Sequence, residues 1–193
     1  MEHWKRCGVA LSFALSGAVT APAFKEGFES HSEALIGLVG LSFGLLVFAL
    51  IWRSIAGALM IPIIVGTWYL AYHVATLMGI SLGDFLYFPM LLGGLIGGMG
   101  LSVCRAISQR ESNLAISAKI CAAAIASAVA LGPWLTQFRL HINSPQGTDQ
   151  TIRLAVGFAV WQGVMGTLLY ILRPAQTPTS KEDLTAGSTR ILD

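Results

Sequence analysis

The sequence predicts an all-α protein, a polytopic transmembrane helical bundle with six spans. Of its 193 residues, 54% are hydrophobic and only 11% are charged, whereas soluble domains carry about 25% charged residues. The apolar residues also form long blocks. Several blocks reach the roughly 20 residues that a helix needs to cross about 30 Å of hydrocarbon.

The predicted spans follow from these blocks and the polar segments between them. We place them at residues 7–24, 34–52, 55–78, 85–104, 114–138 and 151–172. Together they make one bundle over residues 1–173. Residues 174–193 are rich in Thr, Ser and charged residues, so we expect a disordered cytoplasmic tail.

Span 7–24 has two interpretations. A basic start at residues 5–6, an apolar run and Ala-Pro-Ala at 21–23 are typical of a secretory signal peptide. Its cleavage would leave five spans. Small hydroxyl residues, however, recur every four positions and would share one helix face suited to close packing: Ser12, Ser16 and Thr20. We favour a retained span that ends in the polar segment 25–33, because the rest of the chain is itself membrane-spanning.

The second and third spans come from one apolar run, residues 34–79, that is broken only by Arg53. As a single helix this run would be about 69 Å long, twice the hydrocarbon thickness. A charge at the bilayer centre costs at least about 2.5 kcal/mol. We therefore predict a tight hairpin with Arg53 at its turn.

The last three spans are separated by polar or glycine-rich connections. A glycine-rich turn precedes span 85–104, and a polar loop follows it. In span 114–138, Gly132-Pro133 predicts a kink or an early end. The longest polar connection, residues 139–150, then leads to span 151–172.

The basic residues predict the orientation. With a cytoplasmic N-terminus, nine lie on or near the cytoplasmic side: Lys5, Arg6, Arg53, Arg105, Arg110, Lys119, Arg173, Lys181 and Arg190. Three lie near the other side: Lys25, Arg139 and Arg153. This bias follows the positive-inside rule. We expect an integral protein of the cell (inner) membrane, with the lipid bilayer around it and both termini in the cytoplasm.

The fourth span carries a cluster of glycines that leaves one helix face without side chains: Gly93, Gly94, Gly97, Gly98 and Gly100. A neighbouring helix can approach such a face closely. Packing within the monomer is the simplest role. The alternatives are a face for a homo-oligomer or a partner membrane subunit, and a sliding face in a transport cycle.

Polar residues inside the spans are candidates for a site. Tyr69 and His73 share one face of the third span, and ionisable residues in membranes tend to mark functional paths. Gln162 lies near the centre of the sixth span, and Asp84 near the same membrane face as His73. We predict a candidate intramembrane site of Tyr69, His73 and Gln162 with Asp84 at its mouth. Structural roles for His73 and Gln162 remain open.

Several classes of function find no support. The chain has no zinc-protease, serine-hydrolase or P-loop motif and no paired carboxylates within a span, so no catalytic residue is assigned. The three cysteines are far apart in the sequence and none forms a CxxC pair, so we expect no metal site and no cofactor. The chain has no basic run with interleaved aromatic residues, the pattern that would suggest a nucleic-acid partner.

The sequence therefore favours a small multi-pass membrane protein acting as a solute transporter, permease component or channel-like subunit. Short loops and polar residues within two spans favour this class. The alternative is a non-transporting accessory or scaffold subunit that docks through the glycine-rich fourth span.

Overall fold

The computed structural model describes residues 2–53, 55–82, 87–109, 113–140 and 147–173, and these contain only helices. There are six in the described part of the chain: α1 (Glu2–Ser30), α2 (Glu33–Leu50), α3 (Ile55–Leu82), α4 (Tyr87–Gln109), α5 (Leu114–Leu140) and α6 (Gly147–Ile171). The predicted all-helical bundle is confirmed. The predicted tail, 174–193, lies outside the described residues.

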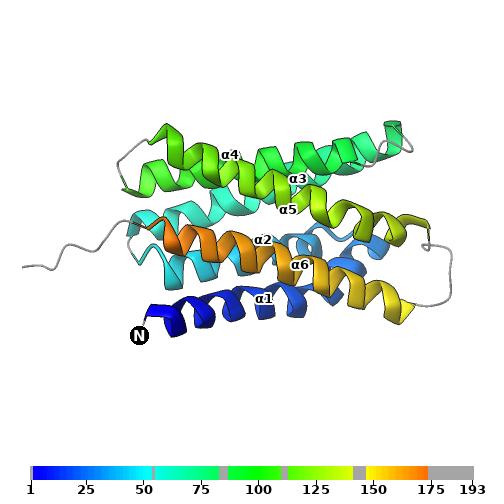
Figure 1. Ribbon diagram of the computed structural model, residues 1–193. Coiled ribbons are helices and arrows are strands. Elements are labelled where there is room, and N and C mark those ends of the chain that lie inside the picture. The colour runs from blue at the N-terminus through cyan, green and yellow to red at the C-terminus, as the bar shows by residue number, and fades with distance from the viewer. Residues whose placement is uncertain (1, 54, 83–86, 110–112, 141–146, 174–193) are drawn as a thin grey trace, which may run out of the picture.

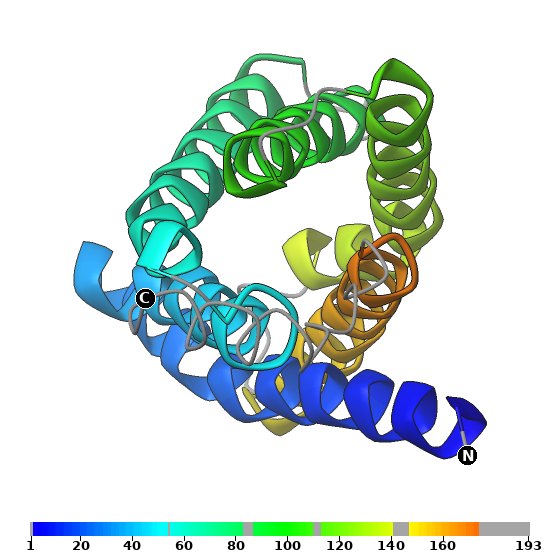
Figure 2. The ribbon, with the colours of Figure 1, turned by 90° about the vertical axis from the view of Figure 1, so that its left-hand side faces the viewer.

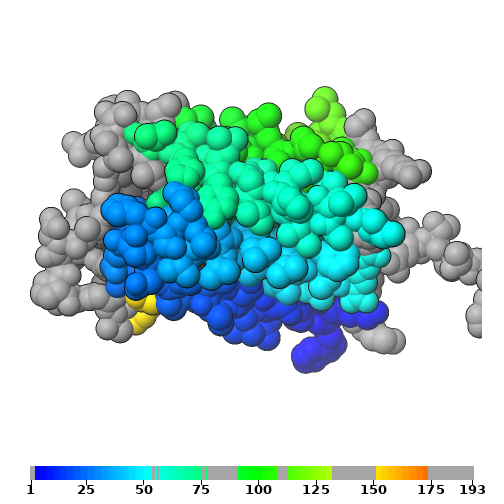
Figure 3. Space-filling view, turned by 180° about the vertical axis from the view of Figure 1, so that it is seen from behind, coloured from blue at the N-terminus to red at the C-terminus, as the bar shows by residue number. Residues whose placement is uncertain are grey.

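The helices form a closed ring. Each packs against its neighbours in the chain, and α6 returns to pack along α1 (Figures 1 and 2). Figure 3 shows the face formed by α1, α2 and α3, which lie side by side. Both ends of the described chain reach the same end of the bundle, as an even number of spans requires (Figure 1).

The outer surface of the ring is apolar. Five helices are long and apolar enough to cross a membrane: α1, α2, α3, α5 and α6. The apolar stretch of α4 within the described residues, Leu91–Ile107, is shorter. On α1, Leu11, Leu15 and Val19 recur every four residues and are 55–75% exposed. An outward stripe of this kind suits lipid rather than water.

The inward face of α1 differs from the predicted packing face by one position. Phe13, Gly17, Ala21 and Phe24 are buried, whereas the predicted serines and threonine are only half-buried. Of these, the Ser12 and Thr20 hydroxyls donate to carbonyls of their own helix, at 2.9 Å each. The close approach to α6 is made at Gly17, which lies against the backbone of Phe158.

Helix α1 also continues beyond its predicted end, through residues 25–30. An ion pair of 3.1 Å between Lys25 and Glu29 links successive turns, so polarity does not break the helix. The stop comes at His31, whose φ of 55° is left-handed. The Ser32 N–H then donates to the Gly27 carbonyl at 2.8 Å, the bond of a Schellman cap.

Other boundaries shift by a few residues. Arg53 lies in the turn between α2 and α3 as predicted, and its Nε donates to the Ala49 carbonyl at 2.6 Å. Of the two outcomes predicted for Gly132-Pro133, the early end is wrong, because α5 runs on to Leu140, and the kink stays a prediction. Helix α6 begins at Gly147, inside the predicted loop.

Candidate functional site

The ring contains a partly open cavity of about 200 Å³ that is lined from all six helices. The described lining residues are almost all apolar, and none is charged: Phe24, Gly40, Phe43, Ile64, Thr67, Trp68, Ala71, Tyr72, Gly93, Gly94, Gly97, Leu101, Ala128, Leu131, Gly157, Phe158 and Trp161. An apolar cavity of about 150 Å³ stays dry and binds benzene. The space here therefore suits a solute somewhat larger than one aromatic ring.

Aromatic rings from α1, α2, α3 and α6 form one wall of the cavity. Phe24 packs edge-to-face on Phe158, with ring centroids 4.9 Å apart, and on Tyr72 at 5.7 Å. Trp68 is held by its indole N–H, which donates to the Ile36 carbonyl at 3.1 Å. Such pairs add stability beyond the area they bury, so this wall is expected to be rigid.

The glycines of α4 bring the neighbouring helices close. A Cβ on Gly94 would lie 2.8 Å from the Ala124 carbonyl oxygen of α5, and one on Gly98 would lie 2.8 Å from the Cys121 Cα. Gly100 meets a threonine side chain of α3 in the same way. These three glycines therefore pack against helices of the same chain.

The other two glycines of the cluster, Gly93 and Gly97, line the cavity, as Gly94 also does. The nearest group to a Cβ on Gly97 is the Trp161 ring, at 3.9 Å. This distance is ordinary contact, so no neighbour forbids a side chain at Gly97. The absence of one leaves the space that the cavity occupies.

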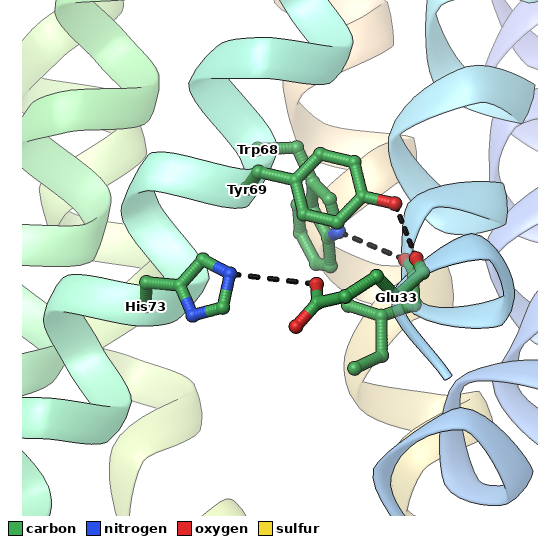
Figure 4. A network of polar contacts seen from close by, with 5 residues as sticks. Glu33, Trp68, Tyr69 and His73 are labelled. Carbon is green, nitrogen blue, oxygen red and sulfur yellow. Dashed lines mark hydrogen bonds and ion pairs between the residues drawn. The ribbon is translucent and has the colours of Figure 1, made fainter. Parts of the chain in front are cut away.

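Tyr69 and His73 meet at the edge of the bundle rather than in the cavity (Figure 4). The Tyr69 hydroxyl donates to the backbone carbonyl of Glu33, at the start of α2. His73 Nε2 lies 3.4 Å from a carboxylate oxygen of Glu33, and these two side chains are 48% and 59% exposed. Their neighbours Trp68 and Tyr72 turn to the cavity instead.

Gln162 lies elsewhere, fully buried where α6 meets α2. Its Nε2 donates to the Val39 carbonyl at 3.3 Å, while its Oε1 has no hydrogen-bond partner. No hydrogen bond in the described part of the chain joins it to Tyr69 or His73. Asp84 lies outside the described residues.

The aromatic residues that line the cavity were not found by sequence reasoning. Helix α3 has aromatic or polar side chains on several faces, so helical periodicity does not show which face points inward. Trp68 and Tyr72, four residues apart, carry the same spacing as Tyr69 and His73. The contacts of Trp68 and Tyr72 with Phe24 and Phe158 distinguish the two faces.

Comparison of the chain with protein-family models, curated proteins and solved structures found no match. The helical, membrane-spanning architecture follows from the length and apolar character of the helices. Inference about its role therefore depends on the ring and the cavity within it.

Proposed function

We propose that this membrane protein binds a small, mainly apolar solute in its central cavity, as a transporter, permease component or channel-like subunit. The observation that carries the proposal is the cavity itself, which all six helices line. Ligand sites in helical bundles commonly lie between the helices, with apolar walls and few polar groups.

The polar groups on the cavity wall are few and uncharged. They are the Thr67 hydroxyl, the Tyr72 phenol and the indoles of Trp68 and Trp161. The Trp68 N–H is already used by a backbone carbonyl. A strongly hydrated solute would lose its water without replacement there, which favours an apolar body.

The scaffold alternative receives less support from the α4 glycines. Gly94 and Gly98 lie against α5 of the same chain, and Gly100 lies against α3. A partner helix that used these positions would have to displace a helix of the ring. The candidate roles of Tyr69, His73, Gln162 and Asp84 in solute or proton handling stay predictions.

Filling the cavity tests the proposal. Gly97→Leu would put a side chain into the cavity without a backbone clash, since the nearest atom to a new Cβ is 3.9 Å away. Gly66→Leu is the matched control, because Gly66 is exposed and a Cβ there meets nothing within 4 Å. Gly97→Ala gives an intermediate step.

The probe is 3-phenylpropan-1-ol, whose binding is measured by calorimetry on protein in zwitterionic nanodiscs, with empty nanodiscs subtracted. Wild type and Gly66→Leu should bind it equally, Gly97→Ala more weakly, and Gly97→Leu not at all. Melting temperatures measured in parallel show that each variant is folded. Equal binding by folded Gly97→Leu would refute the cavity as the solute site.

A further inference from the structure

Arg105 is a charged side chain of α4 that is buried within the bundle. It is 4% exposed, although it lies only one turn from the end of α4. Its Nε–H has no hydrogen-bond partner. Among the described residues, no carboxylate lies within 4.0 Å of its guanidinium. A buried arginine is normally paired, because an uncompensated charge is costly away from water.

The position of Arg105 on α4 relates it to the cavity. Gly97 and Leu101 line the cavity, and Arg105 follows them at the same four-residue spacing. Residues four apart share a helix face, and long helical side chains lean back toward the N-terminus of their helix. Arg105 is therefore expected to lean toward the turn of Leu101 and the end of the cavity.

A second buried donor lies toward the same end of the bundle. Trp52, between α2 and α3, is 5% exposed and its indole Nε1 has no hydrogen-bond partner. It belongs to the cluster of buried side chains that also contains Leu101 and Cys104. Both unsatisfied groups donate hydrogen bonds, so each lacks an acceptor.

We infer that the solute is an amphipathic anion, with its apolar body between the aromatic and glycine walls and its carboxylate on Arg105. This inference rests on the proposed function and specifies the solute. A guanidinium presents N–H donors in a planar fork that matches a carboxylate. With no charged side chain among the described lining residues, Arg105 is the nearest fixed charge on this face of α4.

Three probes of one shape test the charge preference: 3-phenylpropanoate, 3-phenylpropan-1-ol and 3-phenylpropylammonium. In the same nanodisc calorimetry, wild type should bind the anion at least about tenfold more tightly than the alcohol, and the cation most weakly. Arg105→Gln should bring anion and alcohol to within about twofold of each other. Arg53→Gln, at an exposed turn position, should keep the wild-type preference.

Arg105→Lys is a second variant that keeps the test valid if Arg105→Gln does not fold. It retains the positive charge but not the fork, and should keep a reduced preference for the anion. The inference is overturned if folded Arg105→Gln keeps the full preference, or if wild type binds the anion no better than the alcohol or prefers the ammonium. If the alcohol still binds and Gly97→Leu blocks it, only the anion is wrong. If wild type binds none of the probes, the proposed function itself fails.

Discussion

The contact between α1 and α6 at Gly17 provides a test of whether α1 belongs to the mature bundle. In Gly17→Ala, the new Cβ would lie 2.8 Å from the Ala159 backbone nitrogen and still closer to the Phe158 carbonyl. Both obstacles are backbone atoms of a helix, so no side-chain rotation can relieve them. The two helices would have to move apart.

The size of the effect follows from these distances. The Phe158 carbonyl carbon would lie only 2.5 Å from the new Cβ, and ordinary contact begins at 3.4 Å, so the helices must separate by about 0.9 Å. A gap of 0.5–1 Å forfeits about a quarter to a half of the attraction between packed atoms. Overpacking of this kind lowers the free energy of unfolding by about 1–3 kcal/mol. The higher helix propensity of alanine than glycine offsets about 1 kcal/mol of this loss.

Gly8→Ala is the matched control on the same helix, since a Cβ at Gly8 meets nothing within 4 Å. Unfolding of both variants in mixed micelles with increasing SDS, followed by circular dichroism, should give a lower midpoint for Gly17→Ala than for wild type. Gly8→Ala should match or exceed wild type. Equal midpoints for the two variants would refute this packing, as would purified chains that begin after residue 23.

Three further substitutions test helix packing and hydrogen bonds in the same unfolding assay. Gly94→Ala should lower the free energy of unfolding by about 1–3 kcal/mol, and with it the midpoint, because its Cβ meets the α5 backbone. A midpoint like that of wild type would contradict the close approach of α4 and α5. Gln162→Leu removes one long hydrogen bond together with an unpartnered oxygen, and should leave stability unchanged or raise it by up to about 1 kcal/mol. A clear loss would show that the amide has a partner in the membrane. Tyr69→Phe removes the hydroxyl that binds the Glu33 carbonyl and should cost about 1 kcal/mol, whereas no change would mean that water or lipid replaces this bond.

The candidate site was predictable only in part. The sequence identified Tyr69 and His73 as residues that share a face, and they do meet at one residue, Glu33: Tyr69 at its backbone carbonyl and His73 at its carboxylate. It gave no sign that Glu33 would be that partner, because the contact depends on how α2 and α3 align. It also grouped Gln162 with them, although Gln162 lies at a different interface.

Helix number and approximate position, by contrast, were readable from the sequence. The length of an apolar run and the charges that interrupt it are local properties of the chain, and the bilayer thickness converts them into spans. The hairpin at Arg53 follows from the same reasoning, because an apolar run long enough for two spans cannot form a single transmembrane helix.

Only the tertiary structure decided which face of each helix points inward. Nearly every face of these helices is apolar, because side chains that face lipid are apolar like those that face the protein core. Helical periodicity therefore does not show which face is buried. In the closed ring, Trp68, Tyr72 and Gly97 line a common space, and Arg105, which the sequence had placed near the interface, is buried. The cavity exists because side chains from six helices do not fill the centre of their ring, and no single segment encodes that.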